Sequence, residues 1–220
     1  MKRACIGLVV TLTAVVGLGV GVTGSAGAAT PMCDDSGTHG GQPVPSGSNI
    51  QGNLIVPVNA FCTLDNVRVS DKLIVKTGGD LTTQNDSDIG SLVADGADSL
   101  HINYTTFHGL VHALNMNSSS SSRVCNSTVG GNLVIESTSG IYWLVGDCAV
   151  GVAHTFVDGN LVYNSNSFGG DISNTTIGGS LKCAGNSNLT GHEDESGATG
   201  GPHNDGNFGN CASFDFRSNT

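Results

Sequence analysis

Hydrophobic and polar positions along the chain follow one short motif that recurs many times. It consists of an aliphatic residue, two usually small spacers, a polar residue, a Leu, any residue and a final apolar residue, as in Val129 to Ile135. The first, fifth and seventh positions have the same parity, so on an extended strand their side chains point to one side. We therefore expect these positions to form the core. Further copies begin at Ile50, Val69, Val157 and Ile177, with two looser copies at Ile89 and Phe107.

The spacing of these copies predicts the fold. Successive copies begin 18 to 22 residues apart, with one longer interval of 28 residues between Val129 and Val157. One strand motif per unit of about 20 residues is typical of a stacked solenoid. We therefore predict an all-β fold, a single right-handed parallel β-helix of roughly seven coils, its hand following the general preference of parallel crossovers. The longer interval predicts a loop inserted into one coil.

An Asn or Asp stands three residues before most copies of the motif. Both residue types tolerate left-handed backbone and form local hydrogen bonds. We therefore expect a column of them at one corner of the coils, and an Asn ladder along the solenoid axis is a further possibility. The members of this column are Asn66, Asp86, Asn126 and Asn174, with Asp147 as a weaker member.

Composition divides the chain into four segments. Residues 1–29 are predicted to be a cleaved secretory signal, 30–49 an irregular lead-in rich in Gly, Pro and Ser, 50–183 the solenoid, and 184–220 a Gly- and Asn-rich C-terminal cap. We expect caps at both ends because an open solenoid end would expose strand edges to further pairing.

The first segment has the three parts of a secretory signal. Lys2 and Arg3 precede an apolar stretch from Ile6 to Val22, and small residues from Ala26 to Ala29 provide a cleavage region. The alternative is a transmembrane anchor, but the apolar stretch is diluted by Gly and is shorter than the about 20 residues that a spanning helix needs. We therefore expect a secreted, extracellular protein.

The charge of the chain is acidic, with 18 Asp and Glu against 8 Lys and Arg. Cleavage would also remove Lys2 and Arg3, which makes the mature chain more acidic still. This balance does not favour nucleic acid as a partner. No apolar stretch after the signal is long enough to span a membrane, so we expect no membrane attachment of the mature chain.

Six of the seven cysteines lie beyond the signal, and an even number in an exported chain predicts three disulfides. Six cysteines allow fifteen pairings. Cysteines about one coil apart would lie near the inter-strand spacing of about 4.8 Å, within reach of a disulfide. On this ground we expect the pair Cys125–Cys148. Cys183–Cys211 would then tie the tail to the last coil, and Cys33–Cys62 would tie the N-terminal segment to the first.

The exported start, the repeated Gly-Gly-Asn-Leu elements and the closing stretch from Ile177 to Asn186 resemble a group of uncharacterised exported proteins of actinobacteria. The resemblance extends from about Ile50 to Cys211 and implies no activity that could be transferred. The repeats are also similar to those of bactofilin-type polymer-forming proteins and, more distantly, of pectate-lyase-like right-handed β-helices. Bactofilins are cytoplasmic and lack this cysteine pattern, so that likeness implies the architecture alone.

Carboxylates are the candidate catalytic groups, because lyases and hydrolases on β-helices act through clustered Asp residues. Asp86 and Asp88 have the same parity on a strand, and Asp95 and Asp98 follow nearby. The alternative is that these are acidic turn residues at the corners of the coils. This alternative is favoured because lyases of this kind use an Arg as the base, and the mature chain has few arginines.

Metal binding has two candidate groups. His101, His108 and His112 would suit zinc or acid–base chemistry, although no Glu stands near them in the sequence, and solvent-facing histidines are the alternative. The C-terminal segment would suit calcium through oxygen ligands, the alternative being a solvated loop. We expect no resident cofactor. If this second group does bind a metal, we expect the ion to be calcium. The residues of this second group are His192, Glu193, Asp194, Glu195, His203 and Asp205.

Tyr142 and Trp143 are the candidate binding residues, because exposed aromatic rings stack on sugars, whereas buried ones would fill a wider coil.

Three functions remain open. The first is a structural or adhesive protein of the cell surface or extracellular matrix, without catalysis, whose faces bind cell-wall or extracellular polysaccharide or another copy of the chain. The second is a carbohydrate-active enzyme, a polysaccharide lyase or glycoside hydrolase, with carboxylates about 5 to 9.5 Å apart. The third is an ice-binding solenoid, which needs regular rows of Thr. The Thr pairs of this chain are adjacent and point in opposite directions, so we rank ice binding last.

Overall fold

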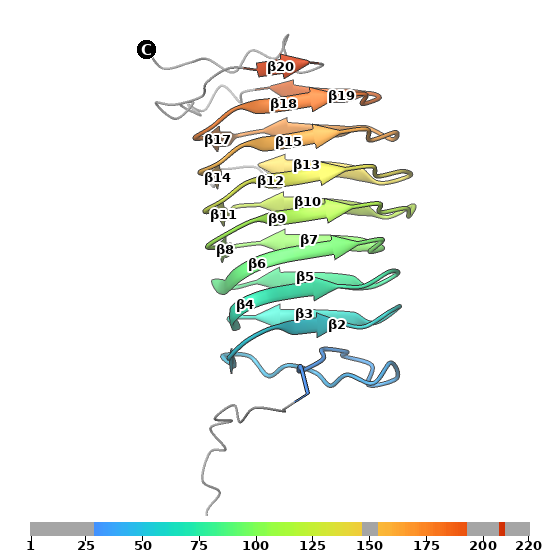
Figure 1. Cartoon of the computed structure of the whole chain (residues 1–220), viewed down its shortest axis with the longest axis vertical. Coiled ribbons are helices and arrows are strands. Elements are labelled where there is room, and N and C mark those ends of the chain that lie inside the picture. Colours follow the sequence, from blue (N-terminus) through green and yellow to red (C-terminus); the bar gives the residue numbers. More distant parts are fainter. Residues whose placement is uncertain (1–28, 147–153, 193–206, 210–220) are drawn as a thin grey trace, which may run out of the picture.

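The computed structural model describes residues 29–146, 154–192 and 207–209, and the regular structure within them is entirely β-strand. Figure 1 shows the strands wound into a solenoid whose axis is vertical in the view. Every strand pairs with its neighbours in parallel, which confirms the predicted parallel β-solenoid. Seven strands stack in one of its sheets, so about six turns separate the first from the last.

Each coil has three sides, which we call the front sheet, the narrow side and the back sheet. The front sheet comprises β2 (Leu54–Val56), β4 (Arg68–Val75), β6 (Ser87–Asp95), β9 (Val111–Leu114), β12 (Leu133–Glu136), β15 (Leu161–Asn164), β18 (Leu181–Ala184) and β20 (Asn207–Gly209). The narrow side comprises β1 (Asn49–Ile50), the first residues of β4 and β6, β8 (Thr105–Phe107), β11 (Thr128–Val129), β14 (Thr155–Val157) and β17 (Thr175–Ile177). The back sheet comprises β3 (Phe61–Asp65), β5 (Asp80–Gln84), β7 (Ser99–Asn103), β10 (Ser121–Cys125), β13 (Tyr142–Gly146), β16 (Gly170–Ser173) and β19 (Leu189–His192).

The core lies inside the three sides and is formed by the positions that the repeat predicts. Val129, Leu133 and Ile135, the first, fifth and seventh residues of one copy, are fully buried. Parallel pairing places equivalent residues on top of one another, so that Leu73 is in register with Leu92. Each such aliphatic side chain contributes about 1.5 to 3 kcal/mol on burial. No single coil encloses enough of them to be stable alone, so the coils depend on their neighbours.

The corner between the back sheet and the narrow side has left-handed backbone, as predicted. Asn66, Asp86, Asn126 and Asn174 all have positive φ angles, between 42° and 61°. Tyr104 occupies the same corner of the coil after Asp86, with a φ of 45°, although nothing in its residue type predicts it. Asp147 lies outside the described residues.

Asparagine ladders link consecutive coils at two other corners. On the surface, Asn132 Oδ1 accepts a hydrogen bond from the backbone N–H of Asn160, whose own Oδ1 accepts one from the N–H of Ser180. Inside the coil, Asn166 is fully buried and its backbone N–H donates to Asn186 Oδ1. These side chains satisfy backbone donors that would otherwise lack partners at the corners.

The N-terminal lead-in covers the first coil as predicted. The backbone N–H of Cys33 donates to the carbonyl of Ile55, and Asp35 accepts a hydrogen bond from the N–H of Thr63. The predicted disulfide between Cys33 and Cys62 is present, with the Cα atoms 5.6 Å apart. Lead-in and first coil are thereby joined both covalently and through the backbone.

The other two predicted disulfides involve residues outside the described ranges. Cys125 and Cys183 are each disulfide-bonded. Their predicted partners, Cys148 and Cys211, lie outside the described residues, as do residues 1–28 of the predicted signal and most of the predicted C-terminal cap. The solenoid continues beyond the predicted end at Cys183, because β19 adds a further strand to the back sheet and β20 pairs with β18.

Candidate functional site

A local change in coil length creates a shallow depression at the corner between the narrow side and the front sheet. Four residue steps lead from Val69 to Leu73 and from Phe107 to Val111, whereas only three lead from Ile89 to Leu92. The register between β4 and β6 shifts at this point, which is a β-bulge. The third coil is therefore shorter at its corner than the coils on either side of it.

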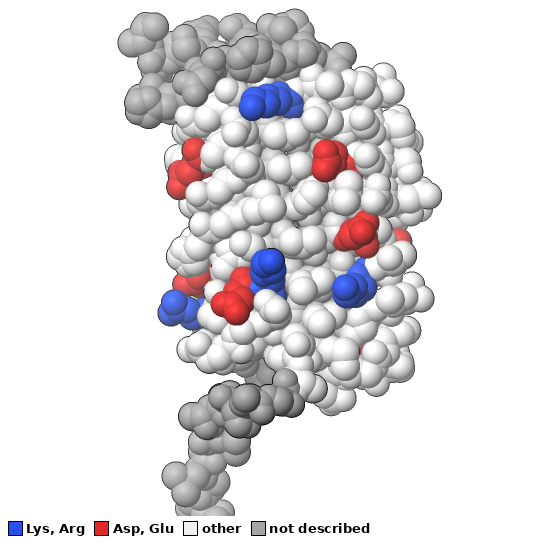
Figure 2. Space-filling view, in the orientation of Figure 1, with Lys and Arg blue, Asp and Glu red and all other residues white. Residues whose placement is uncertain are grey.

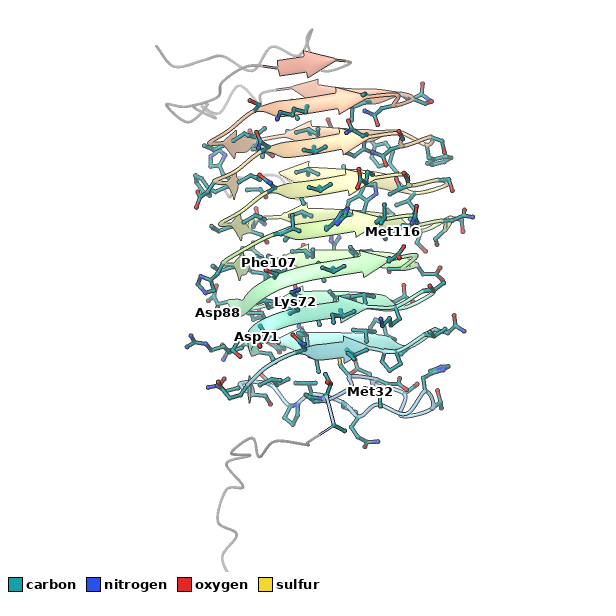
Figure 3. All side chains as sticks on the ribbon, in the orientation of Figure 1. Met32, Asp71, Lys72, Asp88, Phe107 and Met116 are labelled. Atoms are coloured by element: carbon teal, nitrogen blue, oxygen red, sulfur yellow. A yellow bond between two sulfur atoms is a disulfide. The ribbon has the colours of Figure 1, made fainter. Side chains whose placement is uncertain are left out.

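The depression combines several kinds of polar group. Figure 3 shows Asp71 and Lys72 side by side at this corner and Asp88 close by. Glycine is required at the floor, because a Cβ on Gly90 would collide with the backbone carbonyl of Asp71. The lining residues come from four successive coils and are Asn53, Ser70, Asp71, Lys72, Gly90, Ser91, His108 and Gly109.

Hydrogen bonds hold the bulged backbone while leaving charged groups exposed. Asn53 Oδ1 accepts from the backbone N–H of Lys72, and Ser70 Oγ accepts from the N–H of Gly52. Asp71 and Lys72 are both exposed, and within the described part of the chain neither forms an ion pair. A carboxylate, an ammonium group and hydroxyl groups therefore face solvent together, a combination that can hydrogen-bond a polyhydroxylated ligand.

His108 is paired with a carboxylate of the preceding coil. Its Nε2 lies 2.6 Å from Asp88 Oδ1, and the His108 side chain is 62% exposed. A second pair of this kind joins His112 Nε2 to Glu136 Oε1 at 2.9 Å. The second pair was not predicted from the sequence because Glu136 lies one coil further along the chain.

The three predicted histidines do not form one site. His101 Nε2 is bonded to the backbone oxygen of Ser121 on the back sheet, His108 lies at the corner of the narrow side, and His112 points outward from the front sheet. Strand alternation does not relate His108 to His112 because the chain turns a corner between them. Within the described residues, no three His, Cys, Asp or Glu side chains are grouped as metal ligands.

The predicted carboxylate cluster is also dispersed. Asp86 precedes β6 and has a φ of 61°, so the strand alternation that would align it with Asp88 does not apply. Asp88 and Asp95 lie at opposite ends of β6, Asp88 bonded to His108 and Asp95 to Asn115. Asp98 lies in the turn that leads to the back sheet.

Of the two alternatives for Tyr142 and Trp143, exposed rings or rings that fill the coil, Trp143 follows the second. This side chain is 1% exposed inside the coil, whereas Tyr142 is 37% exposed. The two are consecutive in β13, and consecutive strand residues point to opposite sides of a sheet. In the predicted calcium segment, His192 ends β19, and Glu193, Asp194, Glu195, His203 and Asp205 lie outside the described residues.

Comparison with known proteins gives no relative for this chain. No family model matches it, and neither a curated protein nor a solved structure is detectably similar to it. In the part of the chain that the structure describes, no helix is long and apolar enough to cross a membrane.

Proposed function

We propose that this chain is an exported structural or adhesive protein of the cell surface or extracellular matrix, and that it acts without catalysis. The observation that carries the proposal is that carboxylates of the chain form hydrogen bonds between coils and are not grouped in one site. Five of them, distributed over four coils, each bond to a side chain of a neighbouring coil and so hold the coils together. These pairs are Asp65 with Asn85, Asp80 with Ser99, Asp88 with His108, Asp95 with Asn115, and Glu136 with His112.

The regular faces of the solenoid support the same proposal. Equivalent residues recur once per coil, at the strand spacing of about 4.8 Å, so each face repeats along the axis. A repeating surface suits a repeating ligand such as cell-wall or extracellular polysaccharide, or a second copy of the chain. The predicted signal and the disulfides support export, because disulfides persist in oxidising compartments.

The depression at Asp71 is what favours the alternative, a carbohydrate-active enzyme. Its exposed carboxylate and the His108 imidazole line the same depression, and these are two of the side-chain types that act in general acid–base catalysis. An enzyme built on this solenoid would therefore act through Asp71 and His108, rather than through the cluster of Asp86, Asp88, Asp95 and Asp98 that the sequence suggested.

A binding and turnover screen of the mature, oxidised protein tests the proposal. The substrates are purified cell wall and a panel of polysaccharides, each with and without calcium. Retention of the protein without release of reducing ends or unsaturated products supports an adhesive role. If the depression is the binding site, Asp71→Asn should then weaken this retention. Product release that Asp71→Asn abolishes, and that Asp158→Asn on another coil leaves intact, would overturn the proposal and establish the enzyme.

A further inference from the structure

The outward-facing residues of the front sheet differ in character from those of the back sheet. The central outward column of the back sheet is mainly polar and contains Thr63, Thr82, His101, Arg123, Leu144 and Asp171. The equivalent column of the front sheet is mainly aliphatic. Its members in order are Ile55, Ile74, Val93, His112, Val134, Val162 and Lys182.

We call the five aliphatic members, Ile55, Ile74, Val93, Val134 and Val162, the aliphatic stripe. Each lies between two buried residues, so β2 and β12 contain the uninterrupted apolar runs Leu-Ile-Val and Leu-Val-Ile. Strands with such runs are typical of sheets covered on both sides, whereas a sheet facing water alternates apolar and polar residues. Figure 2 shows the charged residues of this face scattered and separated by uncharged surface. The front sheet therefore has the composition of a covered surface.

We propose that the front sheets of two copies of this chain pack face to face, with their solenoid axes antiparallel, to form a dimer. This deepens the proposed function by naming one partner. A second copy matches the stripe because it carries the same aliphatic residues at the same one-coil spacing. The aliphatic residues of one copy can then lie against those of the other along the whole overlap.

The charged residues beside the stripe select the antiparallel arrangement. Lys72 lies in β4, two residues before Ile74, and Lys76 follows the end of β4, two residues after Ile74. In a parallel dimer, with the twofold axis along the solenoid, Lys72 of one copy would face Lys76 of the other on the same coil. Like charges placed opposite each other oppose association.

The antiparallel dimer has a twofold axis along the strand direction, between the third and fourth strands of the front sheet. The second strand then faces the fifth, so Lys76 of each copy lies opposite Glu136 of the other, and Ile74 opposite Val134. Ile55 likewise faces Val162. Lys182, the one formally charged residue of the central column, belongs to the seventh strand and remains outside the overlap.

The size of the face predicts a weak dimer. Six strands about 4.8 Å apart, each presenting about four residues of 3.3 Å, give an overlap of about 30 by 13 Å. This is about 400 Å² per copy, which is below the size of stable protein interfaces and is the size of a weak, transient one. We therefore expect dissociation in the micromolar range, so the dimer must be measured as a function of concentration.

Sedimentation equilibrium of the oxidised mature chain between about 1 and 500 μM tests the proposal. The wild type is expected to pass from monomer to dimer, and Val134→Lys to weaken association at least tenfold. The control is Leu144→Lys, which places the same charge at a half-buried outward position of the back sheet and should leave the dimer intact. A wild type that is monomeric throughout, or equal loss in both variants, would overturn the proposal.

Charge reversal tests the arrangement independently. Lys76→Glu should weaken the dimer, and Lys76→Glu combined with Glu136→Lys should restore it, because the two residues exchange charges across the interface. Cooperative melting would show that the variants remain folded, with a lower melting temperature expected wherever Glu136→Lys removes the pair with His112. No effect of Lys76→Glu would overturn the antiparallel arrangement. The polysaccharide screen is a separate measurement, so failure of the dimer and failure of the adhesive function can be distinguished.

Discussion

The Oδ1 atom of Asn166 accepts two hydrogen bonds from Thr138, one from its backbone N–H at 3.0 Å and one from its hydroxyl at 2.8 Å. The two residues are 28 positions apart in sequence but occupy the same corner of adjacent coils. The Asn166 amide also donates to the carbonyl of Ile135. One fully buried side chain therefore satisfies several backbone and side-chain groups of the neighbouring coil.

Asn166→Ala is expected to lower the free energy of unfolding by about 2 to 4 kcal/mol, because it leaves buried donors and acceptors without partners. Urea denaturation followed by circular dichroism measures the change. Asn160→Ala provides the matched control, since Asn160 belongs to the surface ladder and water can replace its bonds. Its expected cost is about 1 kcal/mol or less. Equal costs for the two variants would contradict a special role for the buried ladder.

The Cys33–Cys62 disulfide should stabilise the N-terminal end of the solenoid. It closes a loop with a sequence separation of 29 residues. The chain-entropy relation for a loop of this length gives about 3 to 4 kcal/mol. Replacing both cysteines by Ser should therefore lower the melting temperature and make the lead-in more susceptible to protease. If the lead-in of the variant resists protease as well as that of the wild type, its backbone pairing is sufficient to hold it on the first coil without the disulfide.

Asp34 should make the N-terminal cap sensitive to acid. The hydrogen bond from the Ser36 hydroxyl is the main cause that lowers the pKa of Asp34 below its usual value of 3.8, and backbone donors of His39 and Ser36 act in the same direction. A carboxyl group with a lowered pKa contributes stability above its unfolded-state pKa and loses it as the pH falls through its folded-state pKa.

Unfolding measured from about pH 5 down to pH 2 tests this expectation, since the contribution should decrease as the pH falls through that interval. Asp34→Asn should be less stable than the wild type at pH 5, and the difference should diminish toward pH 2. Asp71→Asn serves as a control for removing an exposed carboxylate elsewhere. A stability difference for Asp34→Asn that does not change with pH would contradict the assignment.

Gly90 should be the least replaceable residue of the depression. A Cβ at this position would collide with the backbone carbonyl of Asp71, which cannot move without disturbing the bulge. Gly90→Ala is therefore expected to cost about 1 to 3 kcal/mol in the free energy of unfolding. At Gly109 the nearest atom is the Ser91 hydroxyl oxygen, which can rotate away, so Gly109→Ala should cost less. The opposite order in a thermal melt would contradict this packing.

The regular part of the fold was predictable because the repeat fixes which side chains face inward. Val129, Leu133 and Ile135 are buried as their parity requires, and the corner residues Asn66 and Asn126 have left-handed backbone. A parallel stack reproduces each coil on the next, so one motif predicts most of the core. The inward position of Trp143 also follows from strand alternation, once the start of β13 is known.

The candidate site was less predictable because it depends on where the chain turns. Asp86 and His108 lie at corners, where the two-residue alternation of a strand stops applying. The depression beside Asp71 arises from a coil that is one residue shorter than its neighbours. The one sequence signal for it was that the copy beginning at Ile89 fits the repeat less well. The aliphatic stripe was visible as apolar residues at outward positions, but its meaning depends on the register between coils.

Sedimentation of the wild-type, oxidised mature protein with purified cell wall and insoluble polysaccharides tests the proposed function most directly. Bound protein is measured in the pellet, and reducing ends and unsaturated products are measured in the supernatant. A structural or adhesive solenoid should be retained in at least one pellet while the supernatant stays at the level of the protein-free control. Product that accumulates with time and in proportion to protein concentration would contradict the account and identify the chain as a carbohydrate-active enzyme.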